Sequence, residues 1–176
     1  MSRNFEAVLK DNPTSQVRGQ MLLGAHLAGM AIECSMLGAA HACANPLTAK
    51  YGITHGIAVA LMLPHVIQYN SQTVNDLYQD LHPSSLHERI IELKTVAGLP
   101  EWLRSFEITR EDLPELAKEA ASQWTRKFNP RPVDEVELLK LYEAAYCEQR
   151  TGNSTAGGSR ATRSSYRSHG AISPGI

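Results

Sequence analysis

The sequence predicts an all-α domain followed by a tail, and three observations support this organisation. Helix start and stop signals occur along almost all of residues 1–148, whereas the alternating apolar and polar runs of strands are almost absent. Hydrophobic residues make up 43% of the 176 residues, enough for one core of substantial size. Residues 149–176 have a different composition, rich in Ser, Thr, Gly, Arg and Ala. We therefore expect one helical domain over residues 1–148, followed by a tail.

The first elements are a short helix and a long apolar helix. Residues 5–11 favour a short helical piece, and the segment DNPTS then supplies a proline break with Thr14 or Ser15 as the next N-cap. We expect the long helix to end near Pro46, because proline lacks a backbone donor and disfavours helical geometry in the preceding residue. The small residues expected to pack closely against neighbouring backbones in this helix are Gly24, Ala25, Ala28 and Gly29.

Further helices are expected over residues 52–62, residues 86–97, the segment LPELAKEAASQW and residues 133–146. Pro64 should close the first of these, and the second has apolar residues at close to a 3.6-residue period. Thr109 and Asp112 form a plausible capping arrangement before LPELAKEAASQW, which the segment NPRP should end. These elements complete a helical domain without an internal repeat.

The charge distribution separates the body from the tail. The net charge is −1 overall, which gives no general electrostatic argument for binding nucleic acid or an anionic membrane. Residues 149–176 contain four arginines and no acidic residue, and too few large apolar groups to offset the entropy of ordering. We expect this tail to be disordered and solvated, and we expect no nucleic-acid partner.

The cysteines and the long apolar stretch indicate in which cellular compartment to expect the protein. Three cysteines at irregular spacing are unsuited to a disulfide framework, and the N-terminus lacks the apolar core of a secretory signal. Residues 21–44 are long enough to span a bilayer, but Glu33, flanked by His26 and His41, makes a membrane span costly. A cytoplasmic protein with no membrane contact is expected, and His26 is expected to be a packing residue.

His41 and His55 are the candidate metal ligands. On one continuous helix their fourteen-residue separation would place them roughly 21 Å apart, whereas ligands of one ion lie about 2.1 Å from it. Pro46 and Gly52 remove this objection, because they allow the chain to turn between residues 44 and 54 and bring the second histidine back toward the first. From the residues alone, two hydrogen-bonded core histidines remain an alternative.

Two longer strings carry a family resemblance. MLLGAHLAGMAIECSMLGAAHACANPLTAKYGITHGIAVALMLPHVIQYN and NPRPVDEVELLKLYEAAY resemble segments of the iron-containing (group III) alcohol dehydrogenases. The resemblance covers approximately residues 4–147. It is specific, because an LAGMA-type helix, an HA-x-A segment, a second His-Gly pair and an LPHV-x-x-YN stretch occur in the family's order and spacing.

The resemblance implies a fold and a metal site. The chain matches most of the helical, dehydroquinate synthase-like C-terminal domain, which in the family packs against an α/β domain that holds NAD or NADP. Two ligands of a divalent ion, Fe²⁺ or Zn²⁺, correspond to His41 and His55. The other two, an Asp and a His one helical turn apart, are expected upstream of Met1, together with the whole NAD(P) site.

Two further positions follow from the same resemblance. Many members have a histidine where this chain has Asn45, close to the reacting centre. An amide does not titrate, so a proton relay through Asn45 is in doubt, and the alternative is a residue that ends a helix before Pro46. His65 matches a common family residue that is not a ligand, and we interpret it as structural or cleft-lining.

Two hypotheses about function follow. In the first, the chain is the metal-site half of an NAD(P)-dependent alcohol dehydrogenase that acts on a small alcohol or aldehyde by metal-assisted hydride transfer, once a nucleotide-binding domain or an intact subunit completes it in trans. In the second, it is a non-catalytic helical docking module or an inactive truncated paralogue. The chain alone is not expected to be active, and a homo-oligomer is a further expectation, because an uncovered cleft face favours association.

Overall fold

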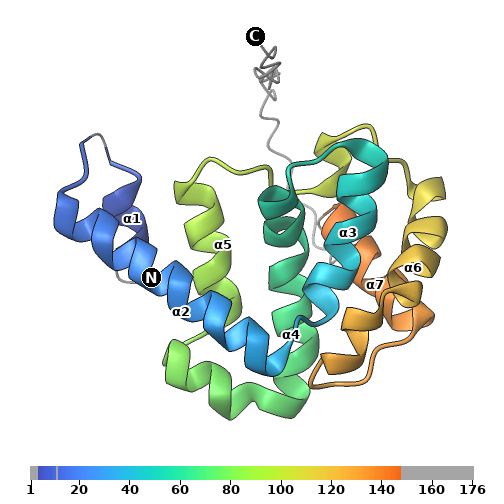
Figure 1. Cartoon of the computed structure of the whole chain (residues 1–176). Helices are drawn as coiled ribbons and strands as arrows, with labels where there is room; N and C mark the ends of the chain where they lie inside the picture. The colour runs from blue at the N-terminus through green and yellow to red at the C-terminus, as the bar shows by residue number, and fades with distance from the viewer. Residues whose placement is uncertain (1–3, 11, 148–176) are drawn as a thin grey trace, which may run out of the picture.

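The computed structural model describes residues 4–10 and 12–147, and these residues form helices joined by loops, with no strand among them (Figure 1). The α-helices are α1 (Phe5–Val8), α2 (Ser15–Ser35), α3 (Ala39–Tyr51), α4 (His55–Leu81), α5 (Leu86–Val96), α6 (Leu113–Ser122) and α7 (Glu135–Tyr146). Three 3₁₀ turns, η1 (Leu103–Ser105), η2 (Arg110–Asp112) and η3 (Trp124–Phe128), lie in the connections. The all-α prediction is confirmed. The expected tail lies outside the described residues.

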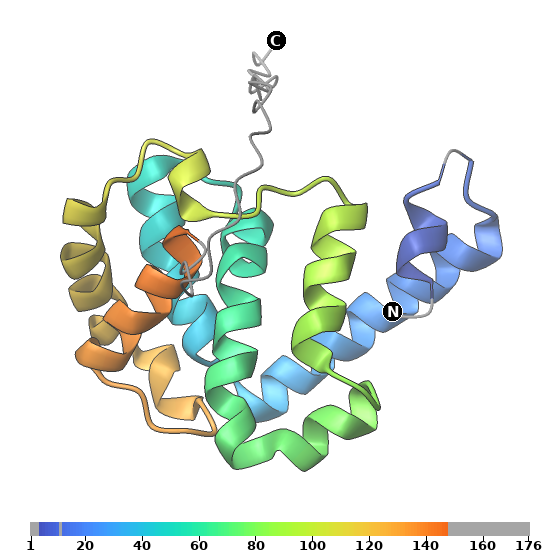
Figure 2. The ribbon, with the colours of Figure 1, turned by 180° about the vertical axis from the view of Figure 1, so that it is seen from behind.

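Helix α3 is at the centre of the core. It packs against α4, α6, α7 and η3, and Figures 1 and 2 show it between α4 and the α6–α7 pair. Five of its side chains, Ala39, Ala42, Cys43, Ala44 and Leu47, have no exposed surface. The small alanines allow close approach of the surrounding helices, whose fully buried residues include Leu61, Leu116, Leu138 and Tyr142. The helix that carries His41 is therefore held on several sides.

The expected helix ends at Pro46 and Pro64 are wrong. Helix α2 already stops at Ser35, and Pro46 lies inside α3, just as Pro64 lies inside α4. Both prolines are buried. An internal proline costs about 3 kcal/mol, and burying the residues on either side of it in a close-packed core offsets that cost.

The real break is at Met36, Leu37 and Gly38. Met36 has φ +61°, a conformation that favours glycine, and the axes of α2 and α3 differ by 106° across this link. Among the described residues no single helix is long and apolar enough to cross a membrane. Helices α2 and α3 meet both criteria only when they are taken together as this bent pair.

Other helix boundaries agree more closely with those predicted from the sequence. Thr14 caps α2 by accepting from the Val17 N–H, and α5 covers the predicted residues 86–97 to within one residue. Thr109 and Asp112 form a full capping box at η2, which leads directly into α6. Helix α6, however, ends at Ser122, before η3, so the NPRP segment does not end it.

Helix α2 is not packed as expected. None of its residues is buried, and its large apolar side chains include Leu22 with 72% and Leu23 with 56% of their surface exposed. His26 is exposed as well, so its assignment as a packing residue is wrong. Of the small residues that indicated close helix packing, Ala25, Ala28 and Gly29 are exposed and Gly24 is half-buried, so that expectation is wrong for this helix.

A candidate metal centre

The chain turns sharply between His41 and His55. Gly52, with φ +63° in the left-handed region, ends α3, and its N–H donates to the carbonyl of Thr48. Helix α4 begins at His55, two residues beyond the buried Ile53. The turn lies within the expected interval of residues 44–54, but Gly52 makes it and Pro46 does not, because α3 continues past the proline to Tyr51.

This turn brings the two histidines together. The ring centroids of His41 and His55 are 5.3 Å apart, with the ring planes tilted by 48°. His41 is partly buried on α3 and His55 is exposed at the first turn of α4. A glycine turn between two helices therefore places two imidazoles, one from each helix, side by side at the surface of the core.

The surroundings favour the uncharged form of His41. Burial lowers the pKa of His41, and the neighbouring His55 ring lowers it further. The Nδ1 atom of His55 lies 3.5 Å from the Thr48 hydroxyl on α3. Neutral imidazole is the form that binds metal ions, and a hydrogen bond to one ring nitrogen directs the other nitrogen outward.

The two histidines fit a divalent ion as a partial ligand set. Their nitrogen donors suit Zn²⁺ or Fe²⁺. Within residues 4–10 and 12–147, no group of three or more His, Cys, Asp or Glu side chains is arranged to hold an ion. A tight catalytic site uses three protein ligands, and two histidines are fewer than such a site needs.

Asn45 lies one helical turn after His41 on the same helix, and it does not end that helix. Its side-chain Nδ2 donates to the Gln123 Oε1 at 3.0 Å, between α6 and η3. A neutral hydrogen bond therefore holds the amide one turn from His41 on α3. This arrangement orients the Asn45 side chain but supplies no titrating group there.

A buried amide pair fixes the beginning of α3, and sequence reasoning missed it. The Asn129 Oδ1 accepts from the Ala39 N–H at 3.3 Å and from the Asn70 Nδ2 at 3.1 Å. The Asn129 Nδ2 donates to the Asn70 Oδ1 and to the Arg131 carbonyl, both at 2.7 Å. Gly38 allows this approach, because a Cβ there would lie 3.1 Å from the Asn129 Oδ1.

The same two segments meet a second time beside this amide pair. The Tyr69 hydroxyl donates to the Pro132 carbonyl at 2.6 Å, and the Arg131 guanidinium lies 3.8 Å from the centre of the Tyr69 ring. Arg131 also donates to the Tyr69 carbonyl at 2.9 Å. Residues 69–70 (YN) and residues 129–132 (NPRP) thus fix the middle of α4 to the chain before α7 and hold the start of α3. The sequence had not predicted a contact between these two segments.

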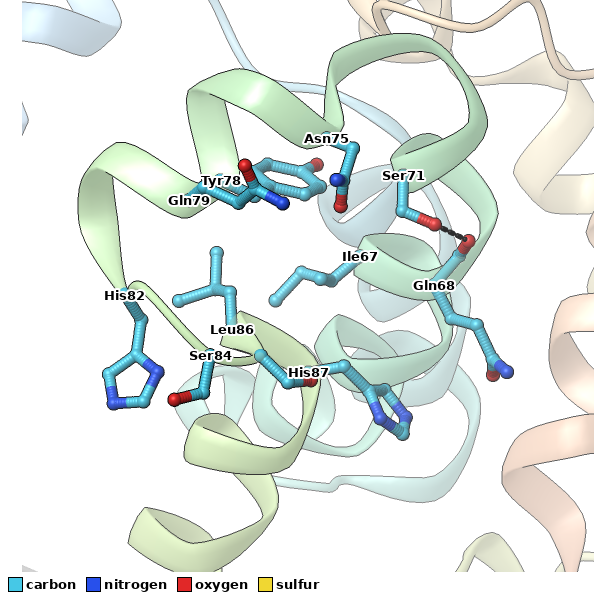
Figure 3. Close-up of a pocket in the computed structure, with 11 residues that line it drawn as sticks. Ile67, Gln68, Ser71, Asn75, Tyr78, Gln79, His82, Ser84, Leu86 and His87 are labelled. Carbon is cyan, nitrogen blue, oxygen red and sulfur yellow. Dashed lines mark hydrogen bonds between the residues drawn. The ribbon is translucent and has the colours of Figure 1, made fainter.

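A pocket of about 240 Å³ lies farther along, between the last part of α4 and the beginning of α5. The amides of Asn75 and Gln79 face it from α4, whereas the rings of His82 and His87 lie at its edge and are directed away from each other (Figure 3). Its titratable groups do not converge, so this pocket offers no metal site and no acid–base pair.

Comparison with known proteins identifies similar chains. Residues 1–146 match the model of the Fe-containing alcohol dehydrogenase family, C-terminal. The lactaldehyde reductase of Escherichia coli (strain K12) is 32% identical over 142 residues, covering 72% of this chain and 37% of that protein. The 1,3-propanediol dehydrogenase of Klebsiella pneumoniae is 28% identical over 162 residues, covering 83% of this chain and 42% of that protein.

Solved structures show the same fold. A 1,3-propanediol oxidoreductase superposes with a TM-score of 0.73 at 26% identity, covering 82% of this chain and 44% of that chain. An alcohol dehydrogenase from Oenococcus oeni also superposes with a TM-score of 0.73, at 23% identity, and supports the fold alone. The chain spans less than half the length of the relatives it matches.

Proposed function

The chain belongs to the Fe-containing alcohol dehydrogenase family, and on that premise we propose that it supplies His41 and His55 as two ligands of a divalent-metal centre in an NAD(P)-dependent alcohol dehydrogenase. The single observation that supports this most directly is the 5.3 Å separation of the two imidazole rings across the Gly52 turn. A nucleotide-binding domain or an intact subunit acting in trans completes the ligand set and holds the nicotinamide cofactor. The substrate is a small alcohol or aldehyde, the class named by the relatives.

Each residue of the site has a limited role. Burial lowers the pKa of His41, which favours its neutral, metal-binding form, and Thr48 orients the His55 ring. A divalent ion held there supplies Lewis acidity, which makes removal of the hydroxyl proton of an alcohol easier. Asn45, held by Gln123, hydrogen-bonds near this position and leaves the proton transfer to another group or to water.

One observation favours a second function, a non-catalytic docking module. Helix α2 exposes several large apolar side chains and has no buried residue, as a helix that docks against another protein does. This reading requires no metal at His41 and His55. Substitution of these histidines should therefore abolish the first function and leave the second intact.

Calorimetric titration with Zn²⁺ tests the metal site in the full 176-residue chain. We expect weak but saturable binding that His41→Ala and His55→Ala each abolish, whereas His26→Ala, which removes an exposed histidine from α2, leaves binding unchanged. Binding that survives in either of the first two variants would refute the ligand assignment.

A chimaera tests the activity separately. Fused to the nucleotide-binding part of the lactaldehyde reductase, the chain should support metal-dependent NAD⁺ reduction that needs both His41 and His55. If the chimaera binds metal and nucleotide without reducing NAD⁺ in the presence of 1,2- or 1,3-diols, the docking function is favoured.

A further inference from the structure

A second pocket lies between α4, α5 and the loop that follows α5. Figure 2 shows the two helices side by side, joined at one end of the molecule by the chain that leaves α4. Its volume is about 450 Å³, within the range of small-molecule sites. The walls include apolar side chains from three segments, Pro64 on α4, Ile91 on α5 and Leu99 in the loop, and the Trp102 indole forms part of the lining. A pocket of this size and character encloses one ring or a short carbon chain.

A buried ammonium group faces this pocket. Lys94 has only 8% of its surface exposed, and its side chain lines the cavity. Its Nζ has one hydrogen-bond acceptor, the Glu101 carbonyl, at the long distance of 3.5 Å. Within the described part of the chain no carboxylate lies within 4.0 Å of the Lys94 Nζ. A buried ammonium carries three donors and is costly to leave under-satisfied, so this group lacks the partner that its burial calls for.

A second donor lies beside Lys94. The His65 ring lines the same pocket, and its centroid is 6.4 Å from that of Trp102. Burial, with a further contribution from the Lys94 charge, lowers the pKa of His65 to about 4, so its ring is neutral near pH 7 and can donate one N–H. The only acid in the lining, Glu101, is exposed.

We propose that this pocket binds a small organic carboxylate, whose charge pairs with the Lys94 ammonium and whose apolar body lies against Trp102 and Leu99. The His65 N–H donates to the second carboxylate oxygen. A neutral ligand would leave the ammonium unpaired, and an inorganic anion would leave the apolar wall uncovered, so both parts of the ligand are required. None of these residues belongs to the His41 and His55 pair, and the inference does not depend on the proposed dehydrogenase function.

Fluorescence of a single tryptophan provides the test. The chain has two tryptophans, and Trp124 is exposed on η3, so Trp124→Phe leaves Trp102 as the only reporter. In this background we expect benzoate to change the Trp102 emission saturably, and benzamide, which has the same ring without the charge, to bind at least about tenfold more weakly.

Two substitutions change the charge at the pocket in opposite directions. Lys94→Met removes the ammonium, keeps an unbranched side chain only one heavy atom shorter, and should weaken benzoate binding by about tenfold or more. Glu101→Gln, at an exposed position that should not affect folding, removes a repelling carboxylate and should tighten binding. Circular dichroism confirms that each variant retains its helices.

The proposal is overturned if benzoate and benzamide bind equally, if Lys94→Met leaves the benzoate affinity unchanged, or if no saturable response occurs. Competition by sodium sulfate as strong as by benzoate would also overturn it, because the pocket would then recognise any anion. Should Lys94→Met fail to fold, equal benzoate affinity of Glu101→Gln and its parent would reject the proposed charge pairing.

Discussion

Replacement of Asn129 by alanine should destabilise the chain strongly, although this residue lies in a loop with no catalytic role. The Asn129 amide makes hydrogen bonds to the Ala39 N–H, to both ends of the Asn70 amide and to the Arg131 carbonyl. Asn70 and Asn129 have 3% and 8% of their surface exposed, so water does not readily replace the lost partner. Each buried polar group left unsatisfied costs about 1 to 3 kcal/mol.

Two such groups, the Ala39 N–H and the Asn70 amide, lose their partner in Asn129→Ala. We therefore expect a loss of about 3 kcal/mol in the free energy of unfolding, a large fraction of the total for a domain of this size. Urea denaturation measures this loss as a shift of the midpoint. The matched control is Asn75→Ala, an exposed amide on α4, which should change the free energy by less than about 0.5 kcal/mol.

A double-mutant cycle sharpens the test. Once Asn129 is removed, Asn70→Ala should cost less than it does in the parent chain, because the two amides share their hydrogen bonds. The Zn²⁺ affinity of Asn129→Ala should also fall, since α3 carries His41 two residues after Ala39. A loss below about 0.5 kcal/mol for Asn129→Ala, or strictly additive losses in the cycle, would refute the reasoning.

Three further predictions concern other buried groups. Tyr142→Phe removes a hydroxyl that donates to the Cys43 carbonyl at 2.7 Å in the core, and urea denaturation should show a loss of about 1 to 2 kcal/mol; an unchanged midpoint would contradict this. The folded-state pKa of His65 is about 4 against an ordinary 6.5, because of burial and the Lys94 charge, so the unfolded chain takes up its proton first. The neutral His65 ring therefore contributes fully to the free energy of unfolding above about pH 6.5, and this contribution is lost as the pH falls toward 4. Between about pH 7 and 5, the free energy of unfolding of the parent should fall by about 2 kcal/mol more than that of His65→Gln. Equal losses in the two chains would argue against a buried neutral ring. Burial raises the pKa of the Cys43 thiol to about 12, so a thiol reagent should label the exposed Cys34 in the native chain and reach Cys43 only after unfolding, as mass spectrometry of the labelled peptides can verify.

Local chemistry predicted the elements whose boundaries depend on it. Helix α5 has a 3.6-residue apolar period and a Ser85 cap, and α6 follows the capping box of Thr109 and Asp112. The turn between the two histidines was also predictable, because Gly52 adopts a left-handed conformation at little cost. In these segments local preference and tertiary packing agree.

Elsewhere the tertiary structure overrides local preference. Pro46 and Pro64 read as helix ends, yet both lie in helices because the surrounding core is buried. Met36 adopts a positive φ, which is not expected for methionine, so no local sequence signal marked the true end of α2. The Asn70 and Asn129 pair spans 59 residues, and no periodicity connects residues so distant. Contacts of this kind follow from the assembled fold.

The measurement that tests the central claim most directly follows the histidine rings themselves during a Zn²⁺ titration. In imidazole ¹⁵N spectra of the full chain, the resonances of His41 and His55 should shift together with one dissociation constant, while those of His26 stay in place. In His55→Ala, the His41 shift should disappear, because one nitrogen alone binds the ion too weakly. If only one of the two rings responds, or if the His41 response is unchanged in His55→Ala, the two histidines do not share an ion and the proposed metal centre is wrong.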